Sequence, residues 1–215
     1  MILIFFYVYN MSVPSDLSKT KRRVPQQERG ERRVAEVLHA AAGVIAECGY
    51  EAATMTQIAE RAGASIGALY QYFPNKEAIV RALRAHYGNE MEARWAVLDS
   101  TAEQLTVKQM ADCIIDVMVQ FMEDHPAYIP LLSAPMQFKR DEEARNRLRQ
   151  RFADFFRKRN PNLSKDAAFR VANVTLQVVK GLNPLYADAK AKEQQELVRE
   201  FKLVVAAYLD SRLKS

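Results

Sequence analysis

The 215-residue chain is poor in the residue types that build special scaffolds. Its 2 cysteines, Cys48 and Cys113, lie far apart and form no CxxC motif, so neither a disulfide framework nor a zinc site is expected. Its 7 glycines and 8 prolines are too few for a collagen-like or linker protein. The 3 histidines are scattered along the chain. We therefore expect no metal site and no cofactor.

The sequence also lacks an apolar run long enough for a membrane span. The first ten residues, MILIFFYVYN, are almost wholly apolar, but a span needs about 20 residues. They lack the basic region and the cleavage site of a secretory signal. Two interpretations stay open: an upstream start codon or cloning artefact, which we favour, and a membrane-touching anchor. The pattern as a whole predicts a cytoplasmic protein without a membrane partner.

Neither sign of charge is in large excess. The chain has 31 basic and 26 acidic residues, a formal net charge of +5, and 49% hydrophobic residues, as expected for a globular protein with a core. The one dense basic run lies within residues 19–33, and nucleic-acid contact and a solvated tail both explain it. Residues 12–30 are polar and without periodicity. We therefore predict a flexible arm over residues 1–30.

Beyond residue 30, apolar residues recur at helical spacing and almost no strand-like alternation is found. Gly49 is expected to end a first helix, Thr54 and Gln57 to form a capping box, and Ser65 and Asn75 to cap two more helices. Ile66, Leu69 and Phe73 are expected to face inward. Longer helices are predicted over residues 76–98, 106–124, 141–159, 164–182 and 191–213. The predicted fold is all-α.

Two short helices joined by a glycine-containing turn, within residues 55–73, have the dimensions of a helix-turn-helix. The second helix of such a unit lies in the major groove, where glutamine bonds adenine, tyrosine hydroxyls donate to phosphates and small residues allow close approach. A purely structural helix corner is the alternative. The outward or lateral positions are Ser65, Gly67, Ala68, Tyr70, Gln71 and Tyr72.

The string TMTQIAERAGASIGALYQYFPNKEAI, residues 54–79, resembles the DNA-binding domain of the TetR family of bacterial transcriptional repressors. With the preceding helix, the resemblance covers about residues 31–91, and Ala53 departs from a frequent threonine. The family pattern is matched at Thr54, Ile58, Ala59, Ala62, Gly63, Ser65, Gly67, Tyr70, Tyr72, Phe73, Lys76 and Glu77.

The resemblance implies a division of roles. Tyr70, Tyr72 and Lys76 correspond to phosphate contacts, and Lys76 beside helix N-terminal amides agrees with this on physical grounds. Thr54 and Thr56 correspond to positions near a phosphate at the start of the second helix, and we add Gln57 to the DNA-contacting set. The arm residues are expected to supply sequence-independent affinity, foremost Lys21, Arg22 and Arg23.

Residues 92–215 correspond to the family's variable regulatory and dimerisation domain. Helix 106–124 has a narrow polar stripe and is therefore expected in the middle of a bundle. Its soft side chains suit a cavity for a small apolar molecule, with plain core packing as the alternative. The candidate pocket residues are Met110, Cys113, Ile114, Val117, Met118, Phe121, Met122 and, on the following connector, Tyr128.

The last two predicted helices offer more apolar surface than one side of a bundle buries. A two-fold dimer would cover it, and the resemblance implies the same arrangement. The candidate interface residues are Val171, Thr175, Val178, Val179, Phe201, Val204, Val205 and Tyr208.

These features together predict a non-enzymatic regulator of transcription. As a homodimer it would bind a pseudo-palindromic double-stranded DNA operator and release it when a small, largely apolar effector binds. One alternative is a helix-turn-helix regulator controlled by a protein partner. The other is an all-α ligand-binding protein or enzyme, although no nucleophile–base pair is visible. Activator behaviour also stays open.

Overall fold

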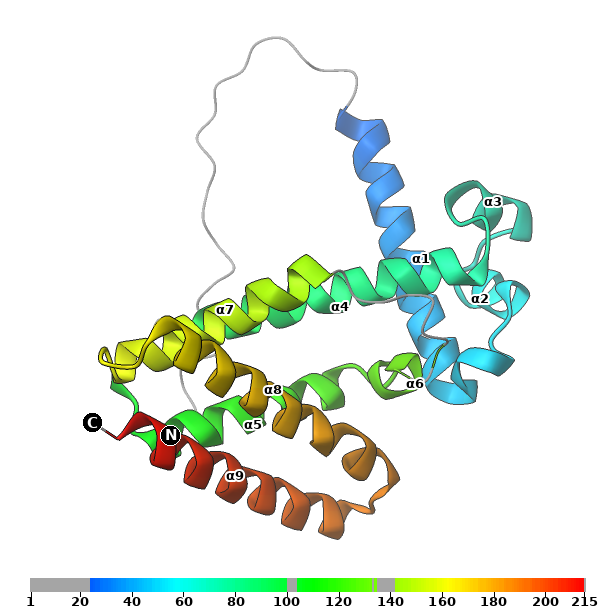
Figure 1. The fold of residues 1–215 in the computed structure, drawn as a ribbon. Helices are drawn as coiled ribbons and strands as arrows, with labels where there is room; N and C mark the ends of the chain where they lie inside the picture. Colours follow the sequence, from blue (N-terminus) through cyan, green and yellow to red (C-terminus); the bar gives the residue numbers. More distant parts are fainter. Residues whose placement is uncertain (1–23, 100–103, 133, 135–141, 215) are drawn as a thin grey trace. The chain divides into compact units, whose positions relative to one another are not determined.

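The computed structural model describes residues 24–99, 104–132, 134 and 142–214 (Figure 1). These residues form nine helices and no strand, so the predicted all-α fold is confirmed. No helix among them is long and apolar enough to cross a membrane. The helices are α1 (Val24–Ala52), α2 (Met55–Arg61), α3 (Ile66–Tyr72), α4 (Lys76–Asp99), α5 (Val107–Asp124), α6 (Tyr128–Leu132), α7 (Glu142–Arg159), α8 (Lys165–Asp188) and α9 (Ala191–Leu213).

The chain divides into two compact units, residues 1–35 and residues 36–215. In the first unit, α1 already begins at Val24, so the prediction of a flexible arm is wrong for residues 24–30. Pro25 lies in the first helical turn, where its missing N–H would have had no partner. Residues 26–29 (QQER) favour helix by propensity although they lack an apolar stripe.

The end of α1 confirms the predicted role of Gly49. Its φ of 78° and ψ of 170° lie in a region that is essentially restricted to glycine. The regular helix breaks there and one further turn follows to Ala52. Gly49 thereby redirects the chain into the segment that precedes α2.

The second unit buries apolar side chains both in its N-terminal helices, such as Ile45 and Ile58, and among its C-terminal helices. Helices α5 and α9 pack side by side, as do α7 with α8 and α8 with α9 (Figure 1). The largest fully buried side chains of this part include Met110, Ile114, Phe121, Phe156 and Leu182. The middle position predicted for the helix over residues 106–124 agrees with the contacts that α5 makes to α4, α8 and α9.

Two features of this unit differ from the prediction. The short helix α6 lies in the segment predicted as a connector, because five apolar residues are too few to show a helical period. Helix α8 continues through Pro184 to Asp188, past the end predicted at residue 182. Proline removes one helix hydrogen bond, but Tyr186 secures the last turn by donating to Glu123 Oε1 over 3.0 Å.

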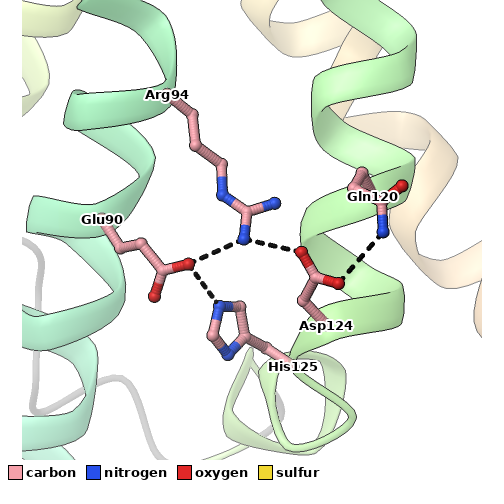
Figure 2. Close-up of polar contacts among 5 residues, drawn as sticks. All are labelled: Glu90, Arg94, Gln120, Asp124 and His125. Atoms are coloured by element: carbon pink, nitrogen blue, oxygen red, sulfur yellow. Dashed lines mark hydrogen bonds and ion pairs between the residues drawn. The ribbon is translucent and has the colours of Figure 1, made fainter. Parts of the chain in front are cut away.

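Helix α4 is tied to α5 by a polar network (Figure 2). Arg94 Nη2 donates to Glu90 Oε1 and to Asp124 Oδ2, each over 2.7 Å. His125 Nε2 lies 2.9 Å from the same Glu90 oxygen, and Gln120 Nε2 donates to Asp124 Oδ1 over 3.0 Å. A single guanidinium therefore bridges carboxylates on two helices.

An aromatic cluster lies beside this network. The Phe121 ring packs edge-on against Tyr87 of α4 and Tyr128 of α6, with centroid distances of 5.8 and 5.0 Å. The guanidinium carbon of Arg94 lies 5.1 Å from the Phe121 centroid. Arg84 of α4 donates to the carbonyl of Leu131 in α6 and to that of Ala134, which follows α6. Helix α4 is thus bound to both α5 and α6.

The network lowers the pKa of both its carboxyl groups. Burial alone would raise the pKa of Glu90, but hydrogen bonds from His125 and Arg94 outweigh it. The hydrogen bond from Arg94 is the main cause of the lowered pKa of Asp124. A carboxyl whose pKa is lower in the folded state stabilises the fold above its unfolded pKa, and this contribution disappears as the pH falls through the folded pKa.

We expect Arg94→Met to lower the free energy of unfolding by about 1 to 2 kcal/mol at neutral pH, because both carboxylates lose their shared donor. The deficit relative to the unsubstituted protein should shrink as the pH falls below the ordinary carboxyl pKa values of 4.5 and 3.8. Urea unfolding across this pH range measures it. Lys108→Met, which breaks an exposed pair with Asp112, is the control and should change little.

Candidate nucleic-acid interface

Helix α2 starts with the predicted capping box. The Gln57 backbone N–H donates to Thr54 Oγ1 over 3.2 Å, and Gln57 Oε1 accepts from the Thr54 N–H over 2.9 Å and from its hydroxyl over 2.8 Å. The Thr54 hydroxyl and the Gln57 carbonyl oxygen are therefore occupied inside the box. Thr56, the third residue predicted here, is exposed.

The turn between α2 and α3 depends on Gly63. Its φ of 60° is left-handed, which lets the chain reverse directly after α2. The Ala62 and Ala64 N–H groups donate to Ile58 and Ala59 carbonyls over 2.9 Å each. The carbonyls at the end of α2 thus stay paired although the helix is only seven residues long.

Helix α3 is anchored through one face only. Its predicted N-cap is present, since Ser65 Oγ accepts from the Ala68 N–H over 3.2 Å. Leu69 is fully buried and Phe73 is nearly so. The prediction that Ile66 faces inward is wrong, because this side chain is 41% exposed. Helical side chains tilt toward the N-terminus, so the first residue of α3 extends beyond the helix end.

The other face of α3 is open and uncharged. Tyr70 and Tyr72 are 51% and 41% exposed, and Gln71 is also exposed. A Cβ placed on Gly67 would have no atom within 4 Å, so the backbone itself is accessible there. Ala68 is half-buried. We call Ile66, Gly67, Tyr70 and Gln71 the recognition face.

The side chain of Lys76, predicted to contact a phosphate, makes its hydrogen bonds within the chain. Its ammonium donates to the carbonyls of Tyr50, Glu51 and Ala53 over 2.7, 3.1 and 2.9 Å. It also lies 4.4 Å from the Tyr50 ring centroid. An ammonium has three donors, and all three are occupied within the chain. Lys76 therefore ties the start of α4 to the end of α1 and to the residue that follows it, and its ammonium has no donor left for the predicted phosphate contact.

A second tie, between α1 and α2, has no counterpart in the sequence analysis. Arg61 Nη2 pairs with Glu47 Oε2, and the guanidinium lies against the backbone of Gly43, where a Cβ would come within 2.6 Å of Arg61 Nη1. The hydrogen bond from Arg61 is the main cause of the lowered pKa of Glu47. The fourteen-residue separation of the pair conceals it in the sequence.

The candidate pocket residues are divided between core and half-buried positions. Met110, Ile114, Met118, Phe121 and Met122 are buried, whereas Cys113, Val117 and Tyr128 are half-buried. Burial, more than the nearby Asp116 and Asp112, raises the pKa of the Cys113 thiol, which makes this thiol a poor nucleophile. A surface hollow of about 330 Å³ lies elsewhere, on α7, lined by Arg147, Gln150, Arg151, Asp154, Phe155 and Lys158.

The candidate interface needs correction. Val171, Thr175, Val179 and Val205 are no more than 2% exposed and pack within the chain, so they cannot lie at a surface. Val178, Phe201 and Tyr208 are half-buried and Val204 is 50% exposed. Val174 and Leu185 on α8 are 44% and 49% exposed. They lie four and seven residues from Val178 and therefore on the same side of α8.

The basic arm residues Lys21, Arg22 and Arg23 lie outside the described residues, as do residues 1–10.

Both halves of the chain match known protein families. Residues 37–83 match the model described as bacterial regulatory proteins, tetR family, and residues 106–209 match the model described as tetracyclin repressor-like, C-terminal domain. The HTH-type transcriptional regulator YfiR of Bacillus subtilis, itself uncharacterized, is 26% identical over 203 residues, 86% of this chain and 96% of YfiR.

Two further relatives are similar. The HTH-type transcriptional repressor KstR of Mycolicibacterium smegmatis is 39% identical over 77 residues, 36% of this chain and 34% of KstR. A TetR-family transcriptional regulator from Streptomyces coelicolor, known from its crystal structure, shares the fold with a TM-score of 0.58 at 20% identity. The match covers 84% of this chain and 99% of that one.

We expect Lys76→Met to lower the free energy of unfolding by about 1.5 to 3 kcal/mol, because three charge-assisted hydrogen bonds are lost. The salt dependence of DNA binding should not change, since no phosphate contact is removed. Chemical unfolding and DNA titrations at several salt concentrations check both statements. Unchanged stability with a salt slope reduced by about 1 would restore the phosphate contact. Lys165→Met, on the exposed start of α8, is the control.

Proposed function

The chain belongs to the tetR family of bacterial regulatory proteins, and from this premise we propose that it is a repressor released from its operator by a small, largely apolar effector. Members of the family are helix-turn-helix regulators of transcription that bind DNA operators as dimers. One observation carries the DNA-binding part of the proposal. The recognition face of α3 is exposed and uncharged, and it belongs to a helix-turn-helix in which a side chain caps the start of each of α2, α3 and α4.

Each exposed side chain of this helix has a role that fits its chemistry. Gln71 reads a base edge, because its amide pairs bidentately with adenine. Tyr70 and Tyr72 donate hydroxyl hydrogen bonds to phosphates, and Gly67 permits close approach of the backbone. Ile66 is exposed on the same helix and offers an apolar contact for a thymine methyl group.

The dimer would form through a face on α8 and α9. This face consists of exposed or half-buried apolar side chains at helical spacing: Val174, Val178 and Leu185 on α8, and Phe201, Val204 and Tyr208 on α9. The two helices meet closely at Gly181, where a Cβ would lie 3.7 Å from the Phe201 ring. A two-fold axis through this face presents two α3 helices to half-sites about one DNA turn apart, or a multiple of it.

Effector control would act through α4. The methionines of α5 are adaptable and line the candidate pocket, and α5 is bound to α4 by Arg94. At its other end α4 starts at Lys76, directly after the Asn75 cap, whose Oδ1 accepts from the Ala78 N–H over 2.8 Å. An effector that favours one position of α5 would therefore shift α4 and, with it, the helix-turn-helix that contains α3.

We expect Gln71→Ala to weaken binding to the operator by about 1 to 3 kcal/mol and to leave binding to random DNA almost unchanged, since a base contact discriminates between sequences. The operator is obtained first by selecting random DNA against the purified protein. Tyr72→Phe is the matched control and should weaken both DNAs equally, because it loses a phosphate contact only. Equal losses for Gln71→Ala on both DNAs would show that Gln71 does not read a base.

We expect Val204→Glu to convert the dimer to a monomer and to lower operator affinity by about 10²-fold or more, because the second half-site is lost. Sedimentation measures the oligomeric state and DNA titration the affinity. Val97→Glu on α4, where the valine is 71% exposed, is the control. A Val204→Glu protein that stays dimeric would place the interface elsewhere.

A further inference from the structure

Two polar side chains on α8 are buried without a hydrogen-bond partner. Thr175 is 1% exposed and Asn183 is 4% exposed, and neither Thr175 Oγ1 nor Asn183 Oδ1 has a partner among the described residues. One further buried side-chain atom, Arg145 Nε, also lacks a partner among the described residues, but its residue is only half-buried. A buried polar group that makes no hydrogen bond destabilises a fold, so these two call for an explanation.

The two residues lie on the same buried side of α8. They are eight residues apart, which is about 12 Å along a helix axis at 1.5 Å per residue. Between them this side consists of apolar side chains, namely Leu176, Val179 and Leu182, all buried. The result is an apolar strip with one hydrogen-bonding group at each end.

The strip belongs to the part of the chain in which the effector site is proposed. Helix α8 packs mainly against α7 and α9 and also contacts α5 and α6, and Tyr186, three residues after Asn183, bonds to Glu123 at the end of α5. The candidate pocket residues Met110, Met118 and Met122 lie on α5. Unbranched methionine side chains rearrange easily, so an apolar molecule can enter between these helices without breaking them.

We propose that Thr175 and Asn183 are the polar anchors of the effector site, an inference that rests on the proposed function. The effector is then an elongated, mostly apolar and uncharged molecule with a hydroxyl or keto group near each end. A threonine hydroxyl and a carboxamide both donate and accept hydrogen bonds, so each matches such a group. A carboxylate does not fit, since none of the described residues places a cationic group in hydrogen-bond contact with either side chain.

The ligand-free protein provides the first test. If the two groups are unpaired, Thr175→Val and Asn183→Leu, which keep volume and remove the polar atoms, raise the unfolding midpoint by about 2 to 8 °C. Thr175→Ser keeps the hydroxyl and is the matched control, without such a rise. A lower midpoint in both polar-to-apolar variants would show that internal partners or buried water already satisfy these groups, and would overturn the proposal.

The second test uses a medium-chain α,ω-diol as probe, with the alkane and the α,ω-dicarboxylate of equal length as comparators. The diol should raise the unfolding midpoint of the unsubstituted protein and of Thr175→Ser. Thr175→Val and Asn183→Leu should each reduce its affinity by about tenfold. Absence of stabilisation by the diol, equal stabilisation by the dicarboxylate, or an undiminished effect in both variants would overturn the proposal.

The proposed function fails separately from this inference. Thermal shifts of the isolated protein need no DNA, whereas the repressor proposal is judged on operator release. Adding the diol to the protein–operator complex should release DNA from the unsubstituted protein, and from Thr175→Val only at about tenfold higher diol concentration. A protein that binds the diol through Thr175 and keeps its DNA would retain the anchors and refute effector-driven release.

Discussion

The ammonium of Lys76 holds together the three segments on which DNA recognition depends. It pairs with carbonyls of Tyr50, Glu51 and Ala53, and so joins the end of α1, the approach to α2 and the first residue of α4. Carbonyls at a break in a helix need donors, and a half-buried ammonium needs acceptors, so each satisfies the other. Because α4 begins at this point and continues without interruption to Asp99, the same residue connects the DNA-facing unit to the helices α5 and α6.

Near the C-terminal end of α4, Arg94 likewise binds this helix to another segment. Its guanidinium joins Glu90 on its own helix to Asp124 on α5 and lies over the Phe121 ring. A continuous helix held at both ends moves as a rigid element, so a displacement of α5 has few ways to be absorbed before it reaches α3. This is the physical basis of the control that we propose, in which an effector in the C-terminal helices changes the position of the recognition helix.

The helix-turn-helix separates residues that build it from residues free to bind. Thr54, Gln57 and Ser65 use side-chain oxygens to cap α2 and α3, while Tyr70, Gln71 and Tyr72 remain exposed. Helices this short are not stable alone, and their caps and the buried Leu69 compensate for this. The exposed residues of α3 are uncharged, so the long-range attraction to DNA must come from basic residues elsewhere in the chain.

Much of this was predictable because its causes are local. Gly49, Thr54, Gly63, Ser65 and Asn75 mark helix ends through backbone conformation or a bond that spans three residues, and the structure places each as predicted. The errors have a different origin. Lys76 binds residues more than twenty positions earlier, and Arg61 pairs with Glu47, fourteen positions earlier. Contacts between residues so far apart produce no short-range pattern in the sequence.

The sequence by itself determined the all-α class, the helix-turn-helix and its caps, since periodicity and capping act over one or two turns. Only the tertiary structure decided which apolar faces are covered. A valine at position 171 and one at position 174 have the same chemistry, yet the first is buried against the chain's own helices and the second is exposed. That difference depends on which helix packs against which, a long-range choice that also buries Thr175 and Asn183 among apolar neighbours.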